Sequence, residues 1–488
     1  MNKSRKLSIV IFLACISLLV GWIYYSKKNI VRVDIVYTND LHGHIEVIPK
    51  ISYYAKKLKK NKNLILLDSG DFLYGTPESE YFKGVSVAET MDYAGYNYVV
   101  LGNHEFDYGE ERLISLLKNK QFKVLGSNIV DKGGNLRPYI TNFDIRDFDG
   151  VKVGIFGLIT SATEKMVFPE NIKDINFSDE LETAKKVVEE MYSNKAQIIL
   201  CLSHIGCLEK YNLYSDGISD TLIAKNVSVN VIFGGHTHRK YKKFVGKTLL
   251  LQSGSYGKYF GHLTLWVHKK YKTIWFSRNK FIKTETFNKV RPEVNLLVNH
   301  YITETSKVYD VVIGETKVPL TREKNKESSL GNLISDIIES SVKCDFAVTN
   351  SGGIRTNLPA GKIKLRDLYL MFPFENTIVY TTLTGKEIKE MFEYGIKNKY
   401  GILQVSKSVK VKILPNGELE IKIKDTPLSE QKNYVVATNS FVGSGGDGYH
   451  WFTKHKVVDT KIKVLDAIKE FFKLYSPVES KVEGRIKI

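Results

Sequence analysis

The chain has 488 residues and a formal net charge of +18, and its length predicts more than one globular domain. Hydrophobic residues make up 43% and charged residues 25% of the sequence, so the composition excludes a wholly disordered chain. The lysines are spread along the sequence, and no zinc-finger, RNA-binding or basic-zipper pattern is present. Sequence-specific binding of nucleic acid is therefore not expected. A diffuse basic surface suits anionic substrates, anionic surface polymers or lipid headgroups, although we favour a general lysine-rich background as its origin.

Residues 1–30 are predicted to be a targeting segment. Three basic residues within the first six precede an apolar run from residue 7 to about residue 25, and Lys27 and Lys28 follow it. The run has about the 20 residues that span a bilayer, exceeds the roughly 7–15 of a cleavable signal peptide, and lacks a small-x-small cleavage site. We therefore predict an uncleaved signal anchor in the cell membrane with the body exported. Secretion or periplasmic release after cleavage is the alternative, and a lipoprotein through Cys15 is less favoured because apolar residues continue beyond it.

The other cysteines are Cys201, Cys207 and Cys344, an odd number that implies no disulfide framework. Cys201 and Cys207 could pair in an exported body, but we favour inert buried thiols at both positions.

Short apolar runs alternate with longer amphipathic stretches over residues 31–288. Runs typical of strands lie at 31–37, 63–67, 98–101, 151–156, 197–202 and 229–233, and residues 178–192 have helical spacing. This alternation predicts a layered α/β domain in which helices cover sheets. Residues 289–310 predict a linker helix, and residues 311–488 predict a second, smaller α/β domain.

Seven polar side chains fall in five short clusters near the ends of predicted strands: Asp40, His42, Asp71, Asn103, His204, His236 and His238. The carboxyl ends of strands in α/β domains converge on one crevice, and residues i and i+2 of an extended segment face the same side. Imidazole, carboxylate and amide donors without thiolate suit Zn, Mn, Fe or Co. A lone histidine at a strand end is more often structural, but five such clusters predict one metal site. His104 also falls in this pattern, and the other six histidines are interpreted as ordinary surface or core residues.

These clusters resemble the calcineurin-like metallophosphoesterase pattern D-x-H, G-D, G-N-H-E, H and G-H-x-H. The segments TNDLHGH (38–44), GNHEFDYG (102–109) and GGHTH (234–238) are similar to the family of 5′-nucleotidases, UDP-sugar hydrolases and 2′,3′-cyclic phosphodiesterases. The resemblance covers nearly all of the chain from residue 31 and implies two divalent metal ions, with Zn, Mn or Co favoured. It implies that one ion is held by Asp40, His42, Asp71 and His238, and the other by Asp71, Asn103, His204 and His236.

His104 stands beside a predicted ligand without being one. A pair of divalent ions activates water and clamps an in-line displacement at phosphorus, so the protein has mainly to position groups and neutralise charge. His104 is expected to stabilise charge on the phosphoryl oxygens or the leaving group, and Asp107 to orient its imidazole. The family resemblance implies the same roles.

Three polar loops of the second domain, at residues 350–355, 372–376 and 441–449, are candidates for substrate binding. An arginine on a glycine-rich loop forms a good fork for phosphate or carboxylate, and phenylalanines beside such loops can stack on a base. The resemblance implies that Phe374 and Phe441 stack the base, while Asn350, Arg355 and Asp447 bind base, phosphate or ribose groups.

One position departs from the family pattern. Lys326 stands where the family commonly has a phosphate-binding arginine, and lysine keeps the charge but loses the bidentate fork. Arg322 is a nearby candidate to replace it.

The sequence thus predicts a metal-dependent phosphoric ester hydrolase, most favourably a 5′-nucleotidase acting on a small nucleotide outside the cytoplasm. A 2′,3′-cyclic phosphodiesterase or a UDP-sugar hydrolase on the same scaffold is the alternative. An inactive surface-binding module is a remote alternative, because a degenerate enzyme is expected to lose metal ligands and all seven are present. Association with nucleic acid is expected to be weak and unspecific.

Overall fold

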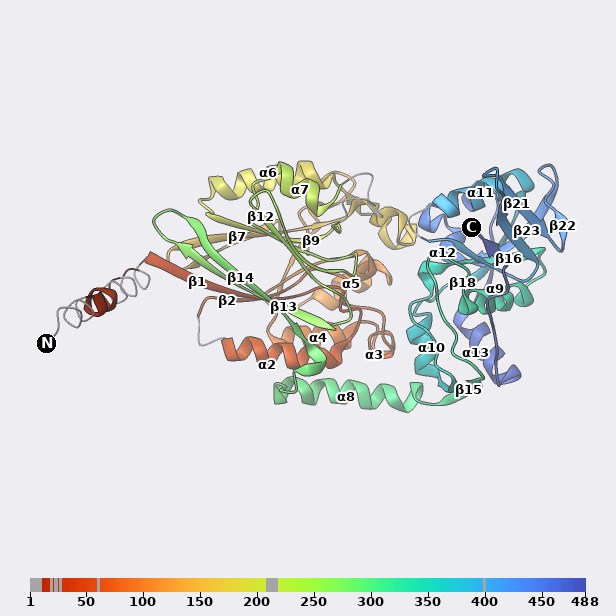
Figure 1. The fold of residues 1–488 in the computed structure, drawn as a ribbon, viewed down its shortest axis with the longest axis horizontal. Coiled ribbons are helices and arrows are strands. Elements are labelled where there is room, and N and C mark those ends of the chain that lie inside the picture. The colour runs from red at the N-terminus through yellow and green to blue at the C-terminus, as the bar shows by residue number, and fades with distance from the viewer. Residues whose placement is uncertain are drawn as a thin grey trace.

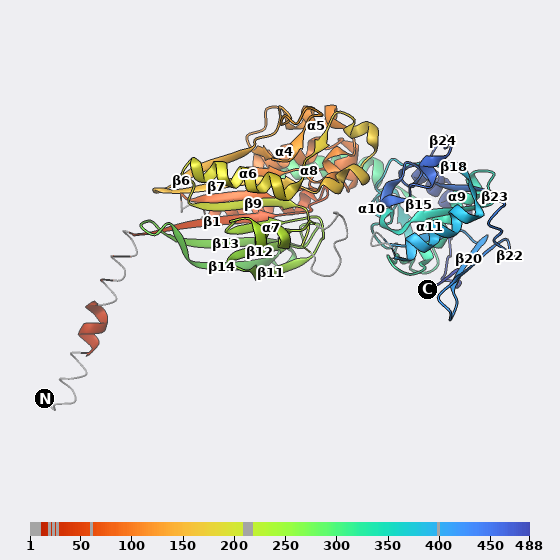
Figure 2. The ribbon, with the colours of Figure 1, turned by 90° about the horizontal axis from the view of Figure 1, so that it is seen from above.

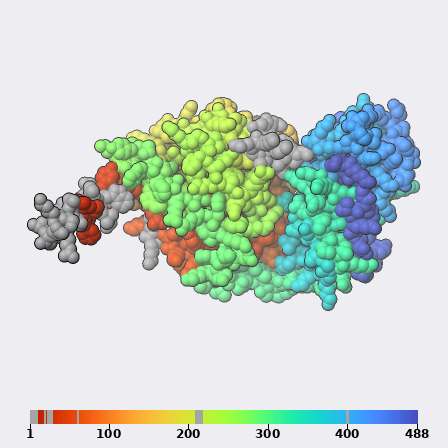
Figure 3. Space-filling view, viewed as in Figure 1, coloured from red at the N-terminus to blue at the C-terminus, as the bar shows by residue number. Residues whose placement is uncertain are grey.

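The computed structural model describes residues 11–17, 21, 25, 29–58, 62–207, 218–397 and 401–488. Most of the predicted signal anchor therefore lies outside the described residues. Among those described, no helix has both the length and the apolar character that crossing a membrane requires. The described residues from Ile30 onward form two lobes joined by one long helix (Figures 1 and 3).

The first lobe is built on two six-stranded sheets packed face to face (Figure 2). The first sheet has the order β14-β13-β1-β2-β3-β4, with β1 (Ile30–Thr38), β2 (Leu64–Asp68), β3 (Tyr98–Val100), β4 (Lys123–Leu125), β13 (Tyr259–His268) and β14 (Thr273–Lys283). The second has the order β11-β12-β10-β9-β7-β6, with β6 (Phe143–Phe148), β7 (Val151–Ile159), β9 (Ile198–His204), β10 (Val231–Gly234), β11 (Lys240–Val245) and β12 (Thr248–Ser253). A short pair, β5 (Ile129–Val130) with β8 (Asn176–Phe177), lies outside both sheets.

Alternating side chains of the central strands explain this packing. Val33, Ile35 and Tyr37 of β1 point into the core between the sheets, whereas Val36 of the same strand belongs to the core on the outer face. Helices α2 (Ile48–Leu58), α4 (Val85–Ala94) and α5 (Glu110–Leu117) cover the outer face of the first sheet, and α6 (Glu180–Ser193) and α7 (Asp220–Asn226) cover the second. The predicted layered α/β fold is confirmed. Strands β11 to β14, two antiparallel hairpins, were not predicted.

Helix α8 (Pro292–Tyr309) leaves the first lobe and leads to the second. Its residues Val294, Val298 and Tyr301 are buried against α2 and α4, so the helix belongs structurally to the first lobe. At its far end, Arg366 of α10 (Leu365–Met371) forms ion pairs with Asp310, at 2.7 Å, and with Glu78 of α3 (Pro77–Tyr81), at 2.5 Å. These contacts bind the two lobes to each other at the end of α8.

The second, smaller lobe is also an α/β domain, as predicted. Its main sheet has the order β19-β16-β23-β18-β24, with β16 (Phe346–Asn350), β18 (Thr377–Thr384), β19 (Leu403–Val405), β23 (Asn433–Asn439) and β24 (Val458–Lys463). Helices α9 (Ser329–Ser341), α10 and α13 (Val464–Tyr475) cover one face, and α11 (Gly385–Lys397) covers the other. The second lobe also contains two smaller sheets. One pairs β15 (Val312–Thr316) with β17 (Gly361–Lys364), and the other consists of β20 (Val409–Ile413), β21 (Leu419–Ile423), β22 (Thr426–Pro427) and β25 (Ile486–Lys487).

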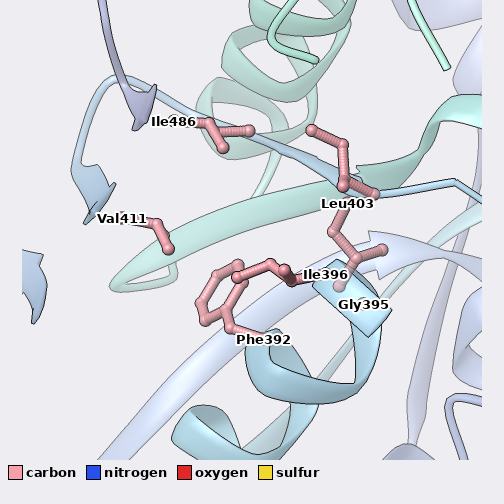
Figure 4. A pocket seen from close by; sticks show the side chains of 7 residues that line it. Phe392, Gly395, Ile396, Leu403, Val411 and Ile486 are labelled. Carbon is pink, nitrogen blue, oxygen red and sulfur yellow. The ribbon is translucent and has the colours of Figure 1, made fainter. Parts of the chain in front are cut away.

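A small cavity of about 10 Å³ lies beside α11 (Figure 4). Apolar side chains such as Phe392, Leu403, Val411 and Ile486 line it, so it offers a polar ligand no partner and is a packing gap in the core. Cys201 and Cys207 are buried free thiols in the first lobe, as favoured, and they do not pair.

Candidate metal centre and interdomain cleft

The predicted ligands lie at the carboxyl ends of strands in both sheets of the first lobe, at the end that faces the second lobe. Five of the seven have a left-handed backbone: Asp40 (φ 51°), His42 (φ 46°), Asp71 (φ 55°), His236 (φ 70°) and His238 (φ 56°). Positive φ is uncommon for residues other than glycine, and such strained positions concentrate at functional sites where the surrounding structure enforces them. The local backbone is thus shaped to aim these side chains rather than to continue regular structure.

Four of these side chains form a first cluster. The ligand atoms of Asp40, His42, Asp71 and His238 all lie within 4.8 Å of one another. The Nε2 atoms of His42 and His238 are 3.0 Å apart, and Nε2 of His238 is 3.3 Å from Oδ1 of Asp40. Two imidazole nitrogens at this separation attract each other only through a shared proton or cation, and the adjacent carboxylates favour the same positive charge.

Asp71 also belongs to a second cluster with His204 and His236, again within 4.8 Å. Nε2 of His204 is 3.0 Å from Oδ2 of Asp71, while its Nδ1 donates to the carbonyl of Ser69 at 2.7 Å, which leaves Nε2 as the coordinating atom. The buried Oδ1 of Asn103 accepts no hydrogen bond from any residue that the structure describes. A buried carbonyl oxygen without a donor is costly, and a cation beside Asp71 would satisfy it. The donors present therefore fit divalent metal ions.

The electrostatics of the two clusters favour the same ligand. Burial lowers the pKa of His42 and of His236 well below the usual value, so both rings are neutral and offer lone pairs. Burial by itself acts to raise the pKa of the Asp71 carboxyl, but His204 and His104 beside it hold that pKa well below its usual range. The ionised carboxylate of Asp71 therefore lies beside the neutral rings of His42 and His236, and, against the effect of burial, it raises the pKa of His204 to about 10. The positive charge that this carboxylate attracts is one that a divalent cation would supply.

Glu105 supports the centre and was not identified from the sequence. Its buried carboxylate accepts backbone N–H groups from Asp71 (2.8 Å), Phe72 (2.8 Å), Leu73 (2.9 Å) and Gly102 (2.6 Å). One side chain thus fixes the loops that follow β2 and β3, which carry Asp71 and Asn103. Its position directly after His104 in the G-N-H-E motif was the available signal.

Two further features hold the loops together. Asn39 donates through Nδ2 to Oδ2 of Asp40 and to the carbonyl of Gly254, both at 2.6 Å, so it ties the loop after β1 to the loop after β12. A Cβ atom at Gly102 would lie 2.2 Å from Oδ1 of Asp71, and one at Gly235 would lie 2.5 Å from the carbonyl oxygen of Ser69. These glycines allow a close approach of backbone to ligand that no larger residue permits.

His104 and Asp107 form the predicted dyad beside this centre. Nδ1 of His104 lies 2.8 Å from Oδ2 of Asp107, and the backbone N–H of His104 donates to Oδ1 of Asp71 at 2.9 Å. Burial opposes protonation of the ring, but Asp107 and Asp71 outweigh it and raise the pKa of His104. The backbone carbonyl of Asp107 accepts from Asn171 at 2.8 Å, which fixes the dyad from a third segment. The ring is therefore oriented and disposed to carry a proton.

A cleft of about 1180 Å³ lies between the lobes and joins this centre to the second domain. From the first lobe it is lined by Asp71, Asn103, His104, Asp107, His236 and His238, and from the second by all five predicted substrate residues, Asn350, Arg355, Phe374, Phe441 and Asp447. The ring of Phe374 stacks on that of His104, with centroids 6.0 Å apart and planes inclined by 28°. The Arg355 guanidinium lies 5.9 Å from the centroid of the Phe374 ring. The structure thus brings the predicted substrate loops to the predicted metal centre.

The polar residues of the second domain hold one another in place. Nδ2 of Asn350 donates to Oδ2 of Asp447 at 2.8 Å, and Oδ1 of Asn350 accepts from Asn439 at 3.0 Å. Tyr394 donates to the backbone carbonyl of Asp447, whose φ is 54°. Burial raises the pKa of Asp447 to about 6. This network places fixed polar groups in the cleft together with the ring of Phe441.

The departure at Lys326 has a structural counterpart. Lys326 is exposed and does not line the cleft, whereas Arg322 and Lys324 do. Arg322 donates through Nη1 to the carbonyl of Arg355 at 3.1 Å, so it lies beside the predicted phosphate-binding arginine. Lys324 was not singled out from the sequence. The only signal for Lys324 in the sequence was its position between Arg322 and Lys326.

The two halves of the chain match two known domain families. Residues 33–240 match the sequence profile of calcineurin-like phosphoesterases, and residues 312–454 match the profile of the 5′-nucleotidase C-terminal domain. The chain is similar to the 5′-nucleotidase of Vibrio vulnificus, with 26% identity covering 92% of this chain and 91% of that protein. It is also similar to the crystal structure of a 5′-nucleotidase precursor from Thermus thermophilus, with a TM-score of 0.83 and 27% identity over 93% of this chain and 99% of that one.

Two Bacillus subtilis proteins are longer relatives. Endonuclease YhcR is 27% identical and Trifunctional nucleotide phosphoesterase protein YfkN is 28% identical, each over 94% of this chain. The chain spans only 41% and 35% of their respective lengths.

Proposed function

Because the chain belongs to the family that joins a calcineurin-like phosphoesterase domain to a 5′-nucleotidase C-terminal domain, we propose that it is a two-metal 5′-nucleotidase. Its substrate is a nucleoside 5′-monophosphate, which it cleaves with water to a nucleoside and inorganic phosphate. The observation that carries this proposal is the single cleft that unites both carboxylate–imidazole clusters with Arg355, Phe374 and Phe441.

The ligand assignment follows the two clusters. Asp40, His42, Asp71 and His238 would hold one divalent ion, and Asp71, Asn103, His204 and His236 the other, with Zn, Mn or Co favoured by the donor set. When bound, two such ions activate a water molecule for attack and neutralise charge on the phosphoryl group.

The protein's own residues position the ester. Arg355 binds phosphate oxygens, with Arg322 and Lys324 adding positive charge to the same side of the cleft. Phe374 and Phe441 stack the base, and Asn350 and Asp447 provide polar contacts at its edge or at the ribose. His104, oriented by Asp107, carries a proton that stabilises charge on the phosphoryl oxygens or on the departing ribose oxygen.

The site of action is outside the cytoplasm. The apolar run over residues 7–25, flanked by basic residues, supports a tether in the cell membrane that leaves the body exported. Release of the body after cleavage is the alternative. Persistence of the full-length chain in carbonate-washed membranes, with the body open to added protease in intact cells, would support the tether.

A substrate panel tests the proposed activity. Metal-free protein reloaded with Zn, Mn or Co is assayed for phosphate release from AMP, UDP-glucose and 2′,3′-cyclic AMP, with a phosphomonoesterase added where the product is still esterified. We expect the highest kcat/KM with AMP. A preference for the cyclic or the sugar nucleotide would identify the alternative activity, and the relative YfkN is named a trifunctional nucleotide phosphoesterase. Reloaded protein that cleaves none of these, nor bis-p-nitrophenyl phosphate, would be a surface-binding module.

A further inference from the structure

The end of the first lobe opposite the cleft is where the chain enters the fold. The strands of the first sheet from β1 to β4 run parallel, and predicted metal ligands follow the carboxyl ends of β1, β2 and β3, so the first residues of these strands lie at the other end (Figures 1 and 2). The turn between β13 and β14 lies at this end too, because His268 pairs with Ile30. The backbone carbonyl of Asn29 accepts from Lys269 at 2.8 Å, and the hydroxyl of Tyr25 lies 2.8 Å from Nε2 of His268. Residues at the β13–β14 turn are therefore hydrogen-bonded both to the last residue of the apolar run and to Asn29 beyond it.

Aromatic side chains are exposed on this hairpin. Tyr271 is 63% exposed, Trp275 55% and Phe276 59%. A β-bulge causes the last two to be exposed together, because Trp266 pairs with Phe276 and Val267 with Ile274, which leaves Trp275 as an extra residue. The ring of Phe276 lies against the partly buried ring of Trp266, with centroids 5.2 Å apart. Such a group of large apolar side chains on the surface indicates a partner.

The charge of the same end is strongly positive. Residues 254–284 contain no aspartate or glutamate, and the turn itself carries Lys269, Lys270 and Lys272. Exposed lysines also stand at neighbouring turns, Lys62 before β2 and Lys247 between β11 and β12. Asp149, at the β6–β7 turn, is an acidic residue at this end and accepts a hydrogen bond from Asn63. Lysines alone would be explained as protection of an edge strand such as β14 from pairing with another chain. Together with the exposed aromatic rings, they indicate a surface that binds an anionic, partly apolar partner.

We propose that this hairpin surface, made of Lys269, Lys270, Tyr271, Lys272, Trp275 and Phe276, docks on an anionic phospholipid bilayer. Tryptophan and tyrosine favour the depth of lipid headgroups, and juxtamembrane lysines are attracted by anionic lipids. The proposal rests on the membrane tether of the proposed function: with residues 7–25 in the bilayer, a turn hydrogen-bonded to Asn29 lies at the headgroups. Docking of this end holds the cleft between the lobes away from the membrane, open to nucleotides in the surrounding medium.

Fluorescence quenching in nanodiscs tests the contact. The full-length chain, carrying W22F to remove the tryptophan of the apolar run, is inserted in phosphatidylcholine nanodiscs with or without phosphatidylglycerol. Lipid with a nitroxide near the headgroup is then added. The difference between W22F and W22F/W275F isolates the emission of Trp275. We expect this emission to fall about twofold with anionic lipid and less with phosphatidylcholine alone, since headgroup contact places the indole beside the quencher.

Variants separate docking from tethering. K269E/K270E/K272E is expected to abolish the quenching without releasing the chain from the disc. The matched control L474S/Y475S, which removes two exposed apolar residues of α13 in the other lobe, should leave quenching unchanged. W275S/F276S should keep wild-type AMP hydrolysis in detergent, because neither residue lies near the cleft.

An inserted chain whose Trp275 is not quenched refutes docking alone, and a chain that fails to insert refutes both tether and docking. Concentration-dependent dimers that bury Trp275 in detergent would assign the surface to a second copy and overturn the proposal.

Discussion

Glu105→Gln tests whether one buried carboxylate holds the metal loops in place. Each carboxylate oxygen of Glu105 accepts two backbone N–H groups, one from Phe72 and Leu73 and the other from Asp71 and Gly102. A glutamine keeps one of these oxygens but replaces the other with an NH2 group, so two buried N–H donors lose their acceptor and face another donor. At about 1–3 kcal/mol for each unsatisfied buried donor, the expected loss of stability is about 2–6 kcal/mol.

The measurement is thermal unfolding of the metal-free chain at pH 8. Burial and then Asp71 raise the pKa of Glu105 to about 7, so this pH keeps the wild-type carboxylate ionised. A domain of this size loses about 2–4 °C of Tm per kcal/mol, so the transition of the first lobe should fall by at least about 4 °C. The exposed Glu164 provides the control: E164Q should melt as the wild type does. A Tm of E105Q within about 1 °C of the wild type would refute the reasoning.

Four further variants probe the site and its pH dependence. His104→Ala should lower kcat for AMP by about 10²–10³-fold while bound metal, measured by mass spectrometry, stays at the wild-type ratio; equal loss of both would make His104 a ligand. Asp71→Asn should abolish binding of both ions because Asp71 belongs to both clusters, whereas His238→Ala should spare the second ion; identical metal contents would contradict a shared carboxylate. Burial raises the pKa of Glu80 from 4.5 to about 8, so the folded state binds an extra proton between these values and wild-type stability falls as pH rises through them. Glu80→Gln cannot lose that proton, and its Tm relative to wild type should therefore rise over this range; a constant difference would show that Glu80 ionises normally.

The local motifs predicted more of the metal centre than of the sheets around it. A ligand such as His236 or Asp71 directly follows a buried strand and stands beside glycine, so sequence alone indicates where it points. The hairpins β11–β12 and β13–β14 lack that signal, because their strands alternate irregularly and one contains a β-bulge at Trp266. Their pairing with β10 and β1 depends on tertiary contacts that no short window of sequence contains.

Contacts between the lobes were beyond sequence reasoning for the same reason. The stacking of Phe374 on His104 joins residues 270 positions apart and depends on where α8 and the Arg366 ion pairs hold the second domain. From the sequence, Arg322 was only a candidate to replace the missing arginine, because a basic residue four positions from Lys326 can face either the cleft or the solvent. The structure places it beside Arg355. Glu105 was missed because its partners are backbone groups, so its place in the G-N-H-E motif was the one signal that the sequence offered.

The direction of the strands relates the two ends of the first lobe. Parallel strands deliver their carboxyl ends, with the strained polar loops, to the end that the second domain closes, and they leave their first residues at the opposite end. The antiparallel return of β13 then brings a hairpin back beside the entry of the chain, where Lys269 bonds Asn29. Any attachment through the N-terminal segment must therefore act at the end far from the metal ligands. The same topology that gathers Asp40, Asp71 and Asn103 would thus separate the proposed membrane contact from substrate access, and the exposed Trp275 and Phe276 lie at the end where that contact is proposed.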